Sequence, residues 1–166
     1  MSSTLDNFDL DALVVGAGPV GLAMAGDLAW RGLRVRIIDK AEKPSTLSKA
    51  VVLMPRTLEE FAMRGMAEEC MAHGQKMHSF GIHAEGKLIA RTEYNHLDSE
   101  FNFLLCQPQT TTERILRDRL ASFDVPIEWG TELTSYQQDA DGVSLTLRKP
   151  DGATEELRIP YLLGCD

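Results

Sequence analysis

The feature that most constrains this chain is a glycine-rich turn between two short apolar runs. The first run, residues 12–15, leads into GAGPVG at residues 16–21. A helical pattern follows, and a second apolar run, residues 35–38, ends at Asp39. Strand, glycine turn, helix, strand and acid in this order are typical of a fold that binds a dinucleotide. Because the flanking segments agree with the glycines, the sequence predicts nucleotide binding.

Each residue type in this turn has a physical task at such a site. Gly16 permits the tight turn, Gly18 lets the backbone approach a pyrophosphate, and Gly21 lets the helix lie close to the strand. The phosphates then meet free N–H groups at a helix N-terminus, where the helix dipole favours negative charge. Asp39 stands where a carboxylate can accept hydrogen bonds from the ribose of an adenosine. The alternative is a purely structural glycine turn.

Composition limits the partners and the location of the chain. The net charge of −8 over 166 residues disfavours a nucleic acid or a polybasic membrane partner. No apolar run approaches the roughly 20 residues of a membrane span, and the first residues lack the regions of a signal peptide. The three cysteines have no framework spacing, so we expect reduced thiols and a cytoplasmic protein. The sequence leaves open whether identical chains associate.

The segments after Asp39 predict further elements. Residues 40–50 are polar and predict a loop. Residues 57–60 and 110–113 each fit a capping box, which predicts the start of a helix. Short strands are expected within residues 76–105, and another strand over residues 125–129.

Three more β-like runs follow, over residues 131–138, 143–149 and 153–159, with Asp-Gly turns between them. Residues 161–166 then predict a buried strand that ends on an acid. A simple NAD-binding half would reach its third parallel strand soon after Asp39. Here a long α/β excursion comes first, so the order of elements differs from that of a plain NAD-dependent dehydrogenase.

Five ordered motifs resemble the N-terminal part of the FAD-dependent aromatic hydroxylases, the single-component flavoprotein monooxygenases related to para-hydroxybenzoate hydroxylase. The motifs are GAGPVGLAMAGDLAWRGLRVRIIDK, SKAVVLMPRTLEEF, PQTTTERILRDRL, GTELTSYQQDADGVSLTL and YLLGCD. The resemblance covers nearly all of residues 9–166. It implies an α/β fold with a Rossmann-like parallel sheet of the FAD/NAD(P)-binding type. Helices would cover one face of this sheet. A three-stranded β-meander crossover, residues 131–159, would cover the other face.

The resemblance implies FAD as the cofactor and NAD(P)H as the co-substrate of a monooxygenase that acts on a small aromatic, phenol-type ring. In this class the flavin carries the chemistry, while the protein supplies orientation, exclusion of water and electrostatics. We therefore expect no catalytic acid or base. We also expect no metal site, because the spacing of Cys70, His73, His78 and His83 matches no known metal site. One alternative is a non-catalytic module that binds FAD or another adenine dinucleotide. Another, an NAD-dependent dehydrogenase, is disfavoured by PQTTTE and YLLGCD.

The resemblance also assigns cofactor-binding residues around the ADP half of FAD. The residues at the pyrophosphate, the ribose and the adenine are Gly16, Gly18, Pro19, Val20, Gly21, Asp39, Lys40 and Leu133. Lys40 matches a basic position beside the adenine, and a solvated surface lysine is the alternative. Asp166 matches the acid of an Asp-Gly motif that serves both FAD and the reduced nicotinamide.

Two further cofactor-binding positions come from the resemblance. Lys49 falls where the family has an arginine that reaches toward the flavin or pyrophosphate, and lysine lacks the guanidinium fork. Gln109 matches a glutamine that hydrogen-bonds the cofactor, whereas Glu113 is explained as the acid of a capping box. Arg56 matches a motif position, and we expect it to be structural, at the start of a helix.

The sequence ends at Asp166, before the glycine of the Asp-Gly pair, the family's later Gly-Asp segment and most of the substrate domain. We expect residues 1–8 to be an N-terminal tail and residues 9–166 the FAD-binding domain. Residues 76–105 would contribute to the sheet of a substrate domain. The sequence is then either a fragment or a chain without its catalytic half. We expect it to be inactive alone and to have an open sheet edge beside residues 161–164.

Overall fold

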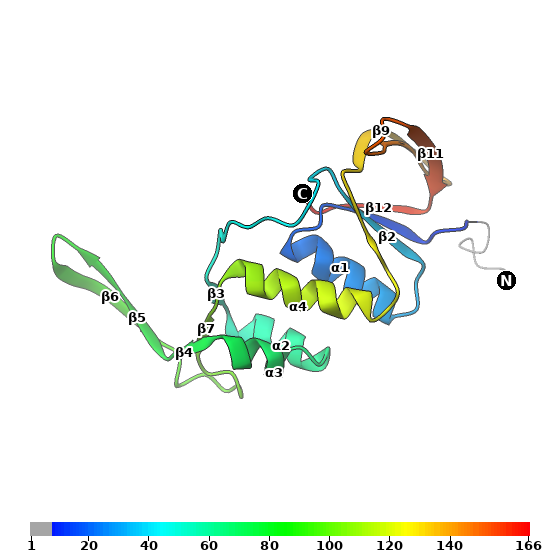
Figure 1. Cartoon of the computed structure of the whole chain (residues 1–166). Helices are drawn as coiled ribbons and strands as arrows, with labels where there is room; N and C mark the ends of the chain where they lie inside the picture. Colours follow the sequence, from blue (N-terminus) through cyan, green and yellow to red (C-terminus); the bar gives the residue numbers. More distant parts are fainter. Residues whose placement is uncertain (1–7) are drawn as a thin grey trace. The chain divides into compact units, whose positions relative to one another are not determined.

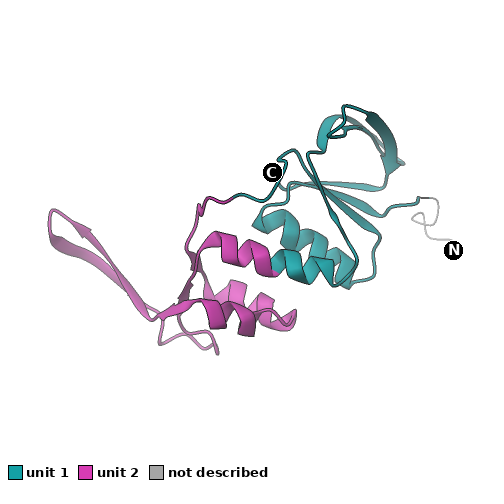
Figure 2. Cartoon of the chain, viewed as in Figure 1, with its two compact units in different colours: residues 1–45, 116–166 teal, residues 46–115 magenta. Residues whose placement is uncertain are grey.

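The computed structural model describes residues 8–166, so only Phe8 of the expected N-terminal tail lies within the described residues. The chain divides into two compact units (Figure 2). The first unit combines residues 1–45 with residues 116–166, and the second is residues 46–115. The sequence of the second unit is therefore inserted into that of the first.

The first unit is built on a four-stranded parallel sheet. Its strands are β1 (Ala12–Val15), β2 (Val35–Asp39), β8 (Ile127–Trp129) and β12 (Tyr161–Gly164). They lie in the order β12-β1-β2-β8, and each neighbouring pair is parallel. The predicted parallel sheet is confirmed. The expectation of a buried strand over residues 161–166 is wrong, because β12 lies at an edge of the sheet and none of its residues is buried. β8 begins later than residue 125, because Pro126 has no N–H for a sheet hydrogen bond.

Helix α1 (Pro19–Trp30) covers one face of this sheet (Figure 1). Proline suits the first helical position because its φ is already helical and it needs no N–H there. The helix ends before Gly32, whose φ of +82° an L-residue rarely adopts. Because side chains alternate along a strand, the buried Val14 and Ile37 face opposite to Leu13 and Ile38.

The opposite face is covered by a β-meander (Figure 1). Its strands are β9 (Glu132–Asp139), β10 (Gly142–Arg148) and β11 (Thr154–Ile159), antiparallel in the order β11-β10-β9. Buried side chains from the meander pack on the sheet in one core cluster: Leu13, Ile38, Val143, Leu145, Leu147 and Ile159. The predicted three-stranded meander crossover is confirmed.

An ion-pair network joins the sheet to the meander. Arg36 in β2 donates to both carboxylate oxygens of Glu128 in β8, at 2.6 and 2.7 Å. It also donates to both oxygens of Glu155 in β11, at 2.9 and 3.1 Å. These bonds raise the pKa of Arg36 and, with Lys149, lower the pKa of Glu155. One guanidinium therefore links three strands through two carboxylates.

The second unit contains short helices and antiparallel strands. Its elements are β3 (Val52–Leu53), α2 (Pro55–Met63), α3 (Ala67–His73), β4 (Gln75–Met77), β5 (Ser79–Ala84), β6 (Lys87–Glu93) and β7 (Leu104–Cys106). Strands β3, β7 and β4 form one sheet, and β5 and β6 form a separate hairpin. The short strands predicted within residues 76–105 are confirmed. Helix α4 (Gln109–Ala121) begins in this unit and continues into the first.

Both predicted capping boxes are wrong. Helix α2 begins at Pro55, so Thr57 lies inside its first turn, and its N-cap Met54 makes no side-chain cap. Proline at the first helical position fixes this start. Helix α4 begins at Gln109, ahead of Thr110, because a distant segment binds the N–H of Gln109.

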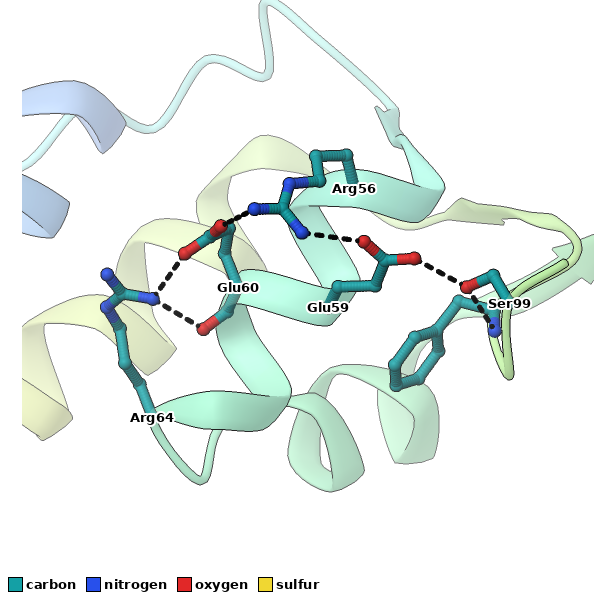
Figure 3. Close-up of polar contacts among 6 residues, drawn as sticks. Arg56, Glu59, Glu60, Arg64 and Ser99 are labelled. Carbon is teal, nitrogen blue, oxygen red and sulfur yellow. Dashed lines mark hydrogen bonds and ion pairs between the residues drawn. The ribbon is translucent and has the colours of Figure 1, made fainter.

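Arg56 lies in the first turn of α2, where the sequence analysis places a structural residue. It forms ion pairs with Glu59 and Glu60 on the same helix (Figure 3). Arg64 binds Glu60 from the helix end, and the Ser99 hydroxyl donates to Glu59 at 2.6 Å. The arginine is thus part of a surface network that ties a loop to the helix.

Candidate functional site

The sheet topology creates a crevice beside β1. From β1 the chain continues to β2 and then β8 on one side, whereas β12 lies on the other side of β1. In open α/β sheets, ligands bind outside the carboxyl ends of the strands, where the strand order reverses in this way. Gly16 follows β1, Asp39 ends β2, and Asp166 comes shortly after β12. Three predicted site residues are therefore brought to one sheet edge.

A small cavity of about 100 Å³ lies at this edge. Its lining residues are Val15, Gly16, Asp39, Lys40, Thr131, Glu132, Leu133 and Asp166. The segment at Thr131 is held there because its N–H donates to the carbonyl oxygen of Asp39 at 3.0 Å. Leu133, which has no polar side chain, thus joins the polar residues at the cavity.

The glycines allow close approaches in the turn. Gly16 has a φ of +104°, and a Cβ there would lie 2.8 Å from the backbone of Cys165 and Asp166. A Cβ on Gly21 would lie 1.8 Å from the carbonyl oxygen of Gly16, so the first turn of α1 needs a glycine. A Cβ on Gly18 would meet no atom within 4 Å. The side of the turn at Gly18 is therefore open to a ligand, as a pyrophosphate site requires.

Asp39 holds the glycine turn in place. Its Oδ2 accepts a hydrogen bond from the N–H of Ala17 at 2.7 Å, and its Oδ1 accepts one from the N–H of Ala41 at 2.8 Å. Each carboxylate oxygen keeps a further lone pair that can accept from a hydroxyl group. The bond to Ala17 escaped sequence analysis, because it joins two residues on either side of a whole helix.

Lys40 and Asp166 face each other at the cavity. Lys40 Nζ lies 3.1 Å from Asp166 Oδ2, and the two side chains are 65% and 67% exposed. This hydrogen bond and the negative charge raise the pKa of Lys40. With Asp39 and Glu132 also present, acids outnumber the lysine in the lining. Such a lining suits a group with hydroxyl donors, while the N-terminus of α1 suits phosphates.

Lys49 and Gln109 lie in two segments of the second unit that are joined by hydrogen bonds. The N–H of Gln109 donates to Ser48 Oγ at 3.0 Å and to the carbonyl oxygen of Ala50 at 3.0 Å. Ser48 Oγ also donates to that carbonyl oxygen at 2.9 Å. Lys49 therefore lies in a segment tied to the first residue of α4. Sequence reasoning missed Ser48, because nothing local marks a bond to a residue so far along the chain.

The side chain of Gln109 is bound from within the helix. Its Nε2 donates to Glu113 Oε1 at 2.7 Å, and Glu113 is 5% exposed. In a capping box, the Glu113 carboxylate would bind the backbone N–H of Thr110. It binds the Gln109 side chain instead, because the helix starts before Thr110. A buried carboxylate on the next turn fixes the amide of a predicted cofactor-binding residue.

Other features of the described residues bear on chemistry. The three cysteines are free thiols, and burial raises the pKa of Cys70. Within residues 8–166, no group of three or more His, Cys, Asp or Glu side chains is placed to hold a metal ion. None of the helices in this part of the chain is both long and apolar enough to cross a membrane.

Comparison with known proteins gives matches along almost the whole chain. A family described as an FAD binding domain matches residues 9–166. The chain is 42% identical over 156 residues to 6-methylpretetramide 4-monooxygenase of Streptomyces rimosus, and the match covers 93% of this chain and 28% of that protein. It is 35% identical to a rifampicin monooxygenase of Streptomyces venezuelae, over 94% of this chain and 31% of that protein.

A solved structure has the same fold. The p-nitrophenol 4-monooxygenase PnpA of Pseudomonas putida DLL-E4 matches with a TM-score of 0.87 and 27% identity, over 95% of this chain and 40% of that one. The chain spans only 28% and 31% of the two curated relatives. The likeness therefore concerns one part of these larger proteins.

Proposed function

The chain belongs to the family of FAD binding domains, and on this premise we propose that it forms the FAD-binding part of an NAD(P)H-dependent monooxygenase. The proposed substrate is a small aromatic compound with a phenol-type ring. Support comes from relatives named as monooxygenases, among them a p-nitrophenol 4-monooxygenase. The observation that carries the proposal is the glycine turn, held by Asp39 and open at Gly18.

The residues at the sheet edge fit the ADP half of FAD. We assign the pyrophosphate to the turn at Gly16, Gly18, Pro19, Val20 and Gly21, where the N-terminus of α1 favours negative charge. The free lone pairs of Asp39 suit the hydroxyls of the ribose. Lys40, Leu133 and Asp166 would complete this end of the site, since they line the same cavity.

Lys49 and Gln109 are proposed as further cofactor-binding residues. Their support is the resemblance of their motifs and the hydrogen bonds that hold both positions within the second unit. When bound, FAD supplies the redox chemistry of hydroxylation, and the chain's own residues bind and orient it. The described residues therefore need no acid or base of their own for this task.

We assign residues 76–105 a contribution to the sheet of a substrate domain. Every residue of β6 is exposed, and Phe80 and Ile82 in β5 are exposed as well. An isolated two-stranded hairpin is marginally stable in water and gains stability when more strands or a helix cover an apolar face. The exposed apolar side chains of this hairpin are consistent with such a cover.

A cytoplasmic location is proposed on the cysteine chemistry. Cys70, Cys106 and Cys165 are free thiols. Proteins of oxidising compartments more often carry paired cysteines.

Ligand binding tests the cofactor assignment. We expect FAD and ADP-ribose to bind the chain better than FMN, because the contacts at the sheet edge address the ADP half that FMN lacks. Flavin fluorescence quenching measures FAD and FMN, and calorimetry measures ADP-ribose. Equal affinity for FAD and FMN would contradict the assignment.

A chimera tests the role in a monooxygenase. Residues 9–166 would replace the matching segment of 6-methylpretetramide 4-monooxygenase, the 42% identical relative. We expect the chimera to retain FAD and to couple NADPH oxidation to hydroxylation of that enzyme's substrate. An Asp39→Ala chimera is the matched control and should lose flavin. A folded chimera that binds no flavin would refute the proposal, whereas flavin binding without turnover would favour a non-catalytic module.

A further inference from the structure

Gln109 is held at both its backbone and its side chain by residues of the second unit. Ser48 Oγ accepts from its N–H at 3.0 Å, and Glu113 Oε1 accepts from its Nε2 at 2.7 Å. Glu113 is buried, one helical turn further along α4. A glutamine side chain normally has considerable rotamer freedom, and these bonds remove much of it.

The carboxylate of Glu113 determines the orientation of the side-chain amide of Gln109. A carboxylate accepts hydrogen bonds and cannot donate them, so the amide nitrogen of Gln109 must face it. The carbonyl oxygen, Oε1, is then at the other end of the amide group. Within residues 8–166 the structure records no hydrogen bond to this oxygen. An acceptor of fixed orientation is therefore available at a residue that is half-buried.

We propose that Glu113 is a positioning residue, which orients Gln109 so that its carbonyl oxygen accepts a hydrogen bond from FAD. Ser48 supports this arrangement by fixing the backbone of Gln109. The inference rests on the proposed function, because it takes Gln109 as a cofactor-binding residue. It adds the direction of the hydrogen bond and the residue that sets it.

The orientation restricts which part of the cofactor Gln109 can contact. The pyrophosphate offers only acceptor oxygens, which an amide oxygen would repel. Donors on FAD are the hydroxyls of the ribose and ribityl chains, the adenine amine and the N3–H of the flavin ring. Asp39 is assigned to the ribose, and Lys40 and Leu133 to the adenine end of the site. Gln109 is therefore assigned to a donor of the flavin half, a ribityl hydroxyl or N3–H.

A double-mutant cycle tests this assignment on the full chain. Dissociation constants for FAD and ADP-ribose are measured for the parent, Glu113→Gln, Gln109→Ala and the double variant. Glutamine at position 113 can present either its oxygen or its NH₂ group to Gln109, so it no longer fixes the direction of the Gln109 amide. Glu113→Gln should therefore weaken FAD binding roughly three- to tenfold, about the worth of one hydrogen bond, and leave ADP-ribose binding unchanged. In the Gln109→Ala background, Glu113→Gln should have no further effect, because it acts through Gln109.

A matched control removes another acid of the same unit. Glu69 pairs with Arg114 of α4 at 2.9 Å, whereas the hydrogen bonds of Gln109 go to other residues. Glu69→Gln should leave the binding of both ligands unchanged. If Glu113→Gln fails to fold in thermal melts, Ser48→Ala takes its place in the cycle with the same expected pattern.

The outcomes separate this inference from the function on which it rests. Additive losses in the double variant, or equal losses for FAD and ADP-ribose, would overturn the positioning role of Glu113. Equal affinity of the parent for FAD and ADP-ribose would overturn the contact with the flavin half, while the adenine site would stand. Binding of neither ligand by the parent would instead refute the proposed function.

Discussion

Replacement of Asp39 by asparagine should disrupt both the glycine turn and the ligand site. The two carboxylate oxygens accept from the N–H groups of Ala17 and Ala41, at 2.7 and 2.8 Å. An asparagine has one oxygen and one NH₂ group, so in either orientation a donor faces one of these N–H groups. The variant loses a hydrogen bond to a charged group, worth about 1.5–3 kcal/mol. It also loses an acceptor for the ribose.

We therefore expect Asp39→Asn and Asp39→Ala to weaken ADP-ribose binding by about 1.5–3 kcal/mol, or roughly 10- to 150-fold. Calorimetric titration measures the affinity, and amide hydrogen exchange of Ala17 should speed up in both variants. Asp151→Asn is a matched control, because Asp151 accepts from the N–H of Ala153 at 2.9 Å in a turn outside the cavity lining. Unchanged ADP-ribose affinity in a folded Asp39 variant would refute the role of Asp39 at the ribose.

Three further outcomes are expected. Gly21→Ala should lower the melting temperature sharply, because its Cβ would lie 1.8 Å from a backbone oxygen, whereas Gly26→Ala in the same helix meets nothing within 4 Å and should be tolerated. Arg36 and Lys149 lower the folded-state pKa of Glu155, so the stabilisation is present above the ordinary glutamate pKa of 4.5 and is lost as pH falls through the lowered pKa. In urea unfolding, the free energy of unfolding of Glu155→Gln should therefore depend less on acid pH. Cys70 is buried with a raised pKa, so it should react with a thiol reagent only after unfolding, and rapid labelling of the native chain would contradict its burial.

The sheet, the meander and the glycine turn could be predicted because their determinants are local. Apolar runs, Asp-Gly turns and the GAGPVG segment each act over a few residues, and the strands formed where these patterns placed them. The capping boxes were wrong because Thr57 and Thr110 compete with stronger starts. Pro55 fixes one helix, and the segment at Ser48 fixes the other.

The remaining contacts of the candidate site join residues that are distant in sequence. Asp39 reaches Ala17 across α1, Arg36 reaches Glu128 and Glu155, and Ser48 reaches Gln109. Each depends on a folded backbone that brings an acceptor opposite a donor. Residue types alone do not indicate such pairs, so the sequence predicted the cofactor-binding residues but not what holds them in place.

The position of β12 next to β1 has a consequence for synthesis on the ribosome. Residues 12–15 pair with residues 161–164, so β1 is made early and gains this neighbour only when nearly all of the described chain has emerged. Until then Leu13 and Ile38 also lack the meander that buries them. Unpaired strand edges and exposed apolar faces in nascent chains favour aggregation. Protection by a chaperone is therefore needed from the synthesis of β2 until residues 131–164 have emerged.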